Sequence, residues 1–214
     1  MPDKPDLAAL VGSRICHDLI SPIGAIGNGV ELFQMETAMK GPELSLITES
    51  IGHANARIRF FRIAFGATST DQRMAGNEVK SILAGMTEGG RYAIDFQSPG
   101  DLARRDVKLV FLLILCLETA LPYGGQISVS WVDARWSLRA VGPRIKIEAG
   151  LWECLIAPDA TVEVGPAQVQ FLLVPEEVTR QHRRLTTELS ASEITLQFCR
   201  AVTASDGAGS GWSG

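Results

Sequence analysis

The sequence has little of what exported, membrane-spanning or nucleic-acid-binding proteins require. Its 214 residues include 20 basic and 24 acidic side chains, so the formal net charge of −4 gives no case for nucleic acid as the main partner. The N-terminal stretch MPDKPDLAAL has acidic residues where a signal peptide has basic ones. The most apolar run, residues 107–117, is shorter than the about 20 residues that cross a bilayer. We therefore expect a cytoplasmic protein that binds neither nucleic acid nor a membrane.

Cysteine is also scarce. The four cysteines, Cys16, Cys116, Cys154 and Cys199, lie far apart and form no C-x-x-C pair. Disulfide frameworks and zinc sites both need cysteines at short, repeated spacings. The sequence therefore predicts reduced thiols, mostly in the protein core, and no metal site.

The first third of the chain has strong helical periodicity. Apolar residues recur there at steps of three and four, which is the signature of one helix face. In residues 6–39 they are Val11, Ile15, Leu19, Ile23, Ile26, Val30 and Phe33, and after the break at Lys40-Gly41-Pro42 they are Leu44, Ile47, Ile51, Ala54, Ile58, Phe61 and Phe65. This pattern predicts two long helices, and the second has the heptad spacing of a helix–helix seam.

Two such helices joined by a tight turn form an antiparallel hairpin, which leaves part of each apolar stripe in water. Pairing of two copies into a four-helix bundle would cover this surface, so we predict a homodimer. The polar stretch Thr68-Ser69-Thr70-Asp71 ends the second helix and begins a short linker. Residues 1–70 are thus expected to form a dimerisation domain.

The remainder of the chain, residues 75–202, is predicted to form an α/β sandwich. Helical segments are expected at 79–86, 105–121, 151–156 and 167–183, and strands at 92–97, 126–132, 136–141, 184–189 and 193–199. A helical hairpin followed by helices packed on a sheet is an α+β architecture. Residues 203–214 have the glycine- and serine-rich composition of a flexible tail.

His17 lies on the first predicted helix, within the stretch RICHDLISPIG. At 100° per residue it shares a row with Ser13, Ser21, Gly24 and Asn28, well away from the apolar stripe. These neighbours are all small or polar, so we expect the imidazole to stand exposed in a shallow patch that another protein can approach.

Asp18 and Pro22 give this histidine an unusual setting. A histidine on a helix is more often structural than functional, but an exposed one has no packing role. Asp18 can orient the imidazole or take a proton from it, which leaves one ring nitrogen free to attack an electrophile. Pro22 frees the carbonyl of Asp18 from the helix ladder and can bend the helix there.

The order His17-Asp18-Leu19, followed by Pro22, resembles the phosphoaccepting box of bacterial histidine kinases. More closely, RICHDLISPIGAIGNGVELF resembles the alphaproteobacterial histidine phosphotransferases of the ChpT type. This resemblance implies a homodimer that relays phosphoryl groups between receiver domains, from that of a hybrid histidine kinase to those of response regulators. It also implies a second domain shaped like a kinase ATP-binding domain that no longer binds ATP.

The resemblance also implies roles for individual residues. His17 and Asp18 would be catalytic, and the receiver domain would supply Mg²⁺, so no cofactor is expected on this chain. The residues expected to contact the partner are Ser13, Arg14, Ser21, Gly24 and Asn28.

The second domain lacks residues that kinases of this type use to bind ATP. Thr119 stands where an asparagine would hold Mg²⁺, and Pro122 stands where a basic residue is expected. Ala140 replaces the aspartate that recognises adenine, and Arg144 replaces a glycine of the following turn. We therefore expect no autophosphorylation.

Three functions stay open at this point. A histidine phosphotransferase is favoured over a dimeric receiver-binding scaffold without phosphoryl chemistry and over a divergent ATP-dependent histidine kinase. A thiol enzyme based on Cys16 is the weakest alternative, because a helical Cys16 points about 100° away from His17.

Overall fold

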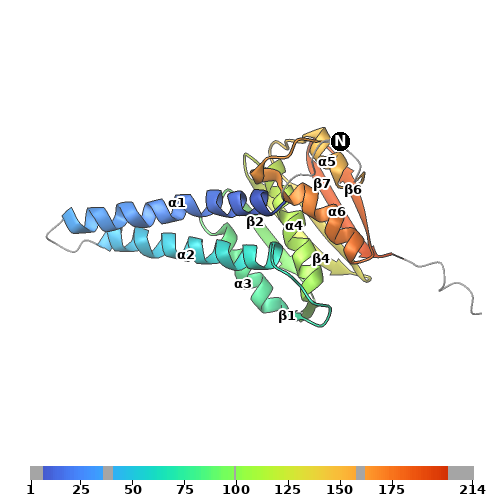
Figure 1. Ribbon diagram of the computed structural model, residues 1–214, viewed down its shortest axis with the longest axis horizontal. Helices are drawn as coiled ribbons and strands as arrows, with labels where there is room; N and C mark the ends of the chain where they lie inside the picture. The colour runs from blue at the N-terminus through green and yellow to red at the C-terminus, as the bar shows by residue number, and fades with distance from the viewer. Residues whose placement is uncertain (1–6, 36–40, 99, 158–161, 202–214) are drawn as a thin grey trace, which may run out of the picture.

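A computed structural model of the protein describes residues 7–35, 41–98, 100–157 and 162–201. Helices α1 (Leu7–Met35) and α2 (Gly41–Ala64) lie side by side as a hairpin that projects from a compact α/β unit (Figure 1). The first helix was predicted over residues 6–39 and the tail over 203–214. Residues 6, 36–39 and 203–214 lie outside the described residues. The two-helix prediction is otherwise confirmed.

The α/β unit contains short strands, a mixed sheet and a layer of helices. Its elements are β1 (Arg73–Ala75), α3 (Gly76–Thr87), β2 (Tyr92–Gln97), β3 (Asp101–Ala103), α4 (Arg104–Ala120), β4 (Gly125–Val132), β5 (Arg135–Val141), α5 (Ala149–Cys154), the 3-10 turn η1 (Pro166–Gln168), α6 (Gln170–Arg180), β6 (Arg183–Leu189) and β7 (Glu193–Arg200). The predicted α+β fold is confirmed. The single helix predicted at 167–183 is divided into η1 and α6.

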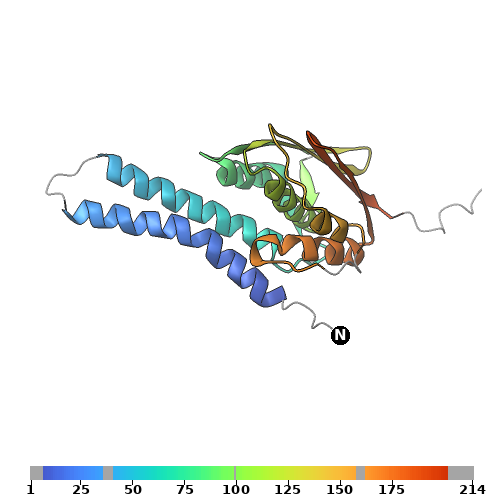
Figure 2. The same ribbon diagram turned by 90° about the horizontal axis from the view of Figure 1, so that it is seen from above.

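The main sheet has the strand order β2-β4-β5-β7-β6, in which β2 pairs with β4 in parallel and the other neighbours are antiparallel. Alternate residues of its central strands are buried, for example Ile127 and Val129 on β4 and Leu138 and Ala140 on β5. Helices gather on this face (Figure 2). The strand periodicity of two therefore produces one apolar face of the sheet. Helix α4, which is almost wholly buried, covers this face.

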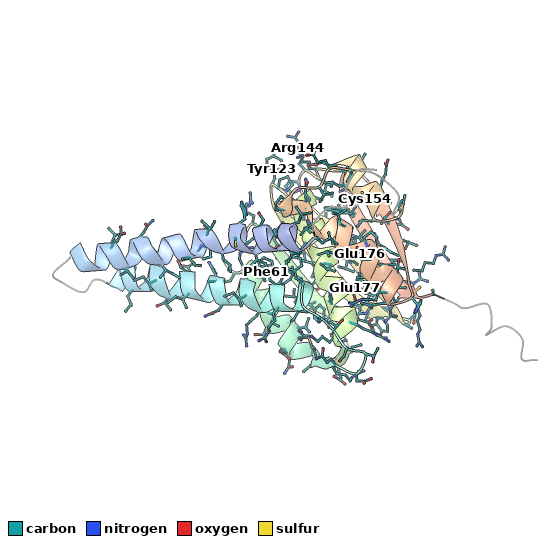
Figure 3. The ribbon with its side chains drawn as sticks, in the orientation of Figure 1. Phe61, Tyr123, Arg144, Cys154, Glu176 and Glu177 are labelled. Carbon is teal, nitrogen blue, oxygen red and sulfur yellow. The ribbon has the colours of Figure 1, made fainter. Side chains whose placement is uncertain are left out.

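The base of the hairpin belongs to the same core. Phe60 of α2 is fully buried and stacks on Phe111 of α4, with ring centroids 4.4 Å apart. Phe61 is also buried, and Figure 3 shows it where the hairpin meets the α/β unit. Phe61 therefore cannot contact a second copy as the heptad pattern suggested. Because hairpin and sandwich share a core, the boundary at residues 70–75 stays a prediction.

Helix α1 continues through Pro22 but is bent near its middle (Figure 2). A proline inside a helix removes one backbone donor and crowds the preceding turn, which produces such a bend. None of the helices in the described part of the chain is long and apolar enough to cross a membrane.

The stacked pair of phenylalanines leads to a stability prediction. Phe60→Ala should lower the free energy of unfolding by about 3–5 kcal/mol, because it opens a cavity between α2 and α4. Chemical denaturation followed by circular dichroism measures this change. Ile156→Ala is the matched control, because Ile156 is 60% exposed and should change stability by at most about 0.5 kcal/mol. Equal effects of the two substitutions would show that α2 is not anchored through Phe60.

Candidate functional site

His17 stands on an open face of α1. Its side chain is 79% exposed, and Ser13, Ser21, Gly24 and Asn28 of the same row are exposed as well. A Cβ placed on Gly24 would meet no atom within 4 Å. The expected row thus exists as an accessible surface. Its use by a partner stays a prediction.

Asp18 connects the exposed histidine to a buried group of charges. The side chain of Asp18 is 9% exposed, and its Oδ1 lies 3.0 Å from His17 Nδ1. The other oxygen, Oδ2, accepts hydrogen bonds from Arg14 Nε at 2.9 Å and from Arg57 at 3.3 Å. The two guanidinium groups therefore fix the Asp18 carboxylate, and the carboxylate in turn fixes one edge of the imidazole.

Arg14 lies on the inner side of α1, and the prediction that it contacts a partner is wrong. The residue is only 7% exposed. Besides its bond to Asp18, the guanidinium donates to the carbonyl of Ala167 and lies 3.9 Å from the Glu118 carboxylate. A buried guanidinium needs several acceptors, and here they come from the α/β unit as well as from α1. Arg14 thus holds the two parts of the chain together.

Glu118 extends this polar group to α4. Burial raises the pKa of the Glu118 carboxyl, and the nearby Arg14 and Arg57 act against that effect. The Tyr92 hydroxyl is hydrogen-bonded to Glu118, and its own pKa is raised by burial and by the Glu118 charge. The site therefore includes a polar layer between hairpin and sandwich that sequence periodicity did not indicate.

A cavity of about 400 Å³ opens beside His17. The lining residues come from α1, α2 and the end of α3 with its following turn, and they are His17, Asp18, Ser21, Pro22, Ala25, Ser50, His53, Arg57, Gly85, Met86, Glu88, Gly89 and Gly90. None of the site residues predicted from the sequence lies on α2 or α3. The antiparallel register that brings Arg57 and His53 opposite His17 depends on the hairpin turn, which periodicity alone does not fix.

Thr119, Ala140 and the turn after β5, from which we expected no ATP binding, take part in packing within the chain. The Thr119 hydroxyl accepts a hydrogen bond from the buried Gln170 side chain at 3.0 Å, while Ala140 is fully buried. A Cβ on Gly142 would lie 2.8 Å from the Leu121 side chain, so the turn after β5 packs closely on the end of α4. At the surface nearby, the Arg144 guanidinium lies 5.5 Å from the centre of the exposed Tyr123 ring (Figure 3).

Cys16 is exposed next to His17. Among residues 7–35, 41–98, 100–157 and 162–201, no three His, Cys, Asp or Glu side chains gather in an arrangement that could hold a metal ion. Asp18 orients His17, and Arg14 and Arg57 bond to Asp18 in turn.

Proteins similar to this chain in sequence and fold are phosphotransferases. Residues 76–193 match the family described as histidine phosphotransferase C-terminal domain. The protein phosphotransferase ChpT of Brucella abortus (strain 2308) is 33% identical over 189 residues, which cover 80% of this chain and 86% of that protein. A solved structure of a bacterial phosphotransferase, 26% identical, superposes with a TM-score of 0.76 over 92% of this chain and 99% of its own. The chain therefore belongs to the histidine phosphotransferase family and is a phosphotransferase of a phosphorelay.

Proposed function

We propose that His17 accepts the phosphoryl group and passes it on, and that Asp18 holds the imidazole during both steps. The observation that carries this proposal is the contact between His17 Nδ1 and Asp18 Oδ1 at 3.0 Å, next to an otherwise exposed ring. An ionised carboxylate can only accept a hydrogen bond, so Nδ1 carries the proton. The lone pair of Nε2 is then free at the exposed edge of the ring.

The transfer follows from this arrangement. Nε2 of His17 attacks the phosphorus of an aspartyl phosphate on a receiver domain. The N–P bond forms as the P–O bond breaks, and the electron pair of that bond returns to the receiver's carboxylate. The imidazole becomes positively charged, and the Asp18 carboxylate stabilises this charge through the Nδ1 proton. The aspartate of a second receiver takes the phosphoryl group in the reverse reaction.

The partners would be receiver domains, first that of a hybrid histidine kinase and then those of response regulators. A receiver must bring its aspartate to Nε2, and the exposed row of Ser13, Ser21, Gly24 and Asn28 leaves room for its surface. The receiver would supply the Mg²⁺ that holds the phosphoryl oxygens. The relay would run in the cytoplasm, where free thiols such as Cys16 stay reduced.

This chain would bind no ATP, because Thr119 and Ala140 make contacts within the protein. Thr119 is hydrogen-bonded to Gln170, and the buried Ala140 has no group that accepts a hydrogen bond from adenine except its backbone carbonyl. The phosphoryl group would therefore arrive already activated, as an aspartyl phosphate.

The active form would be a homodimer with a four-helix bundle. Large apolar side chains of the hairpin are exposed in the single chain, namely Ile20, Ile23, Val30 and Leu32 on α1 and Leu44, Leu46, Ile51 and Ile58 on α2. Leu44, Ile51 and Ile58 are spaced by seven residues, as in a helix–helix seam. Complete burial of an exposed side chain of this size contributes about 1.5–3 kcal/mol. These side chains are 40–68% exposed, so covering each one contributes roughly half of that, which favours a second copy as the cover.

The role of His17 is tested by replacement. His17→Gln should fold as the wild type does but accept no radiolabelled phosphate, either from a phosphorylated receiver or from phosphoramidate. Cys16→Ala is the neighbouring control and should keep the full transfer rate. The wild-type protein given radiolabelled ATP alone should remain unlabelled. Labelling of His17→Gln at the wild-type rate would exclude His17 as the acceptor.

The docking face is tested at Gly24. Gly24→Trp should leave labelling by phosphoramidate intact but reduce transfer from a receiver by at least about 100-fold, because the indole holds the two surfaces apart. Gly24→Ala should transfer almost normally. Gly100→Trp controls for a bulky surface side chain, because Gly100 also has open space around its Cβ position. Unchanged transfer to Gly24→Trp would place the receiver elsewhere.

The dimer is tested by charging its proposed seam. The double variant Ile51→Glu, Ile58→Glu should be a folded monomer in light scattering, because two carboxylates cannot be buried there without partners. Val132→Glu places the same charge at a residue that is 61% exposed on the α/β unit, and it should remain dimeric. A monomeric wild-type protein at micromolar concentration would refute the assembly.

A further inference from the structure

Four charged groups from three helices meet beneath His17. Arg14 and Asp18 come from α1, Arg57 from α2 and Glu118 from α4. Both guanidinium groups bond to Asp18 Oδ2, and Arg14 also lies 3.9 Å from Glu118 Oε2. The cluster thus contains two positive and two negative charges, and the Asp18 carboxylate lies between the positive ones and the imidazole.

The burial of the Glu118 carboxylate lowers the stability of the folded protein. Its Oε2 is buried and has no hydrogen-bond partner among the described residues. Burial raises its pKa, although Arg14 and Arg57 lower it in part. A carboxyl group with a raised pKa in the folded protein destabilises the fold while it is ionised. This cost declines as the pH falls from that pKa towards the ordinary pKa of a carboxyl group, and it is absent below the ordinary value. Burial therefore gives no reason for an acid at this position, apart from its contacts with Arg14 and Tyr92.

The reaction gives such a reason. When Nε2 of His17 bonds to phosphorus, the ring gains a positive charge next to Asp18. If Glu118 were neutral, Arg14 and Arg57 would together outweigh Asp18, and the cluster would carry a net positive charge beside that ring. In a partly buried site such a charge is weakly screened, so it would disfavour the transfer.

We propose that Glu118 is a positioning residue for phosphotransfer, whose carboxylate balances one of the two guanidinium charges so that Asp18 can stabilise the charge on His17. This inference rests on the proposed role of His17. Glu118 reaches Asp18 through Arg14, and the Tyr92 hydroxyl on β2 holds the Glu118 carboxyl in turn. The α/β unit is then a working part of the site, although it supplies no group that touches the phosphoryl donor.

The test uses the full-length protein and phosphoramidate as the phosphodonor, which removes receiver docking from the measurement. Glu118→Gln keeps the side-chain shape and removes the charge. We expect labelling of His17 to slow on the order of tenfold, less than the about 10²–10⁴-fold that loss of a directly acting group costs. The unfolding midpoint at neutral pH should be equal or higher. Glu153→Gln makes the same charge change at an exposed residue and should alter neither quantity.

A second variant separates charge balance from packing. Arg57→Gln combined with Glu118→Gln restores neutrality, so this double variant should label His17 faster than Glu118→Gln alone. A merely structural role predicts the opposite, because the double variant removes two partners from the cluster. ¹⁵N NMR of the imidazole should show Nδ1 less fully protonated in Glu118→Gln than in the wild type.

The labelling and unfolding measurements can each contradict the inference about Glu118. Labelling of Glu118→Gln within twofold of wild type, a lower unfolding midpoint, or no recovery in the double variant would overturn the inference about Glu118. These outcomes leave the proposed function intact, provided that His17→Gln takes no label. Labelling of His17→Gln would instead overturn the proposed function, and the inference with it.

Discussion

The ion pair between Arg14 and Asp18 on α1 links the exposed His17 to the interior of the protein. Arg14 is buried on α1. Its guanidinium also donates to the carbonyl of Ala167 and lies 3.9 Å from the carboxylate of Glu118, both in the α/β unit. A guanidinium holds its donors in a rigid plane, so its hydrogen bonds to Asp18 and Ala167 fix the position of the α1 backbone as well. Asp18 is held on one side by this contact and faces His17 on the other. The placement of an exposed imidazole thus depends on a contact inside the protein.

Polar contacts within the chain connect helices α4 and α6 of the α/β unit. In this chain Gln170 of α6 is fully buried and donates to both Thr119 and the carbonyl of Leu115. A buried amide needs hydrogen-bond partners, and Thr119 and Leu115 of α4 accept from it. These polar contacts hold α6 on α4. The same helix, α4, carries Glu118 next to Thr119, and Glu118 lies 3.9 Å from Arg14 of the hairpin.

Much of the fold could be predicted from periodicity, and the failures have a common cause. The two hairpin helices, α4 and the strands of the main sheet follow patterns that repeat over several turns or residues. Strands β1 and β3 are each three residues long and pair with each other. Three residues are too few to show an alternating pattern in the sequence. At the site, His17 and its open row follow from helix geometry. Arg14 was misplaced because a guanidinium at the edge of a polar row looks exposed until the element that covers it is known. Arg57 and Glu118 were missed because their proximity to His17 depends on tertiary register.

Helix α1 combines three surfaces, and their separation around its axis explains how one segment can serve several contacts. The row of His17 and Gly24 is open and carries small side chains, while Arg14 and Asp18 point into the protein. Ile20 and Ile23 form a third, exposed apolar surface. At 100° per residue, adjacent positions fall on different surfaces, so the pair His17-Asp18 places a reactive ring outside and its orienting acid inside. A carboxylate one turn away on the exposed row would itself be hydrated and mobile. The direct sequence neighbour is the position that allows the acid to be anchored by buried guanidinium groups and still reach Nδ1 of the exposed ring.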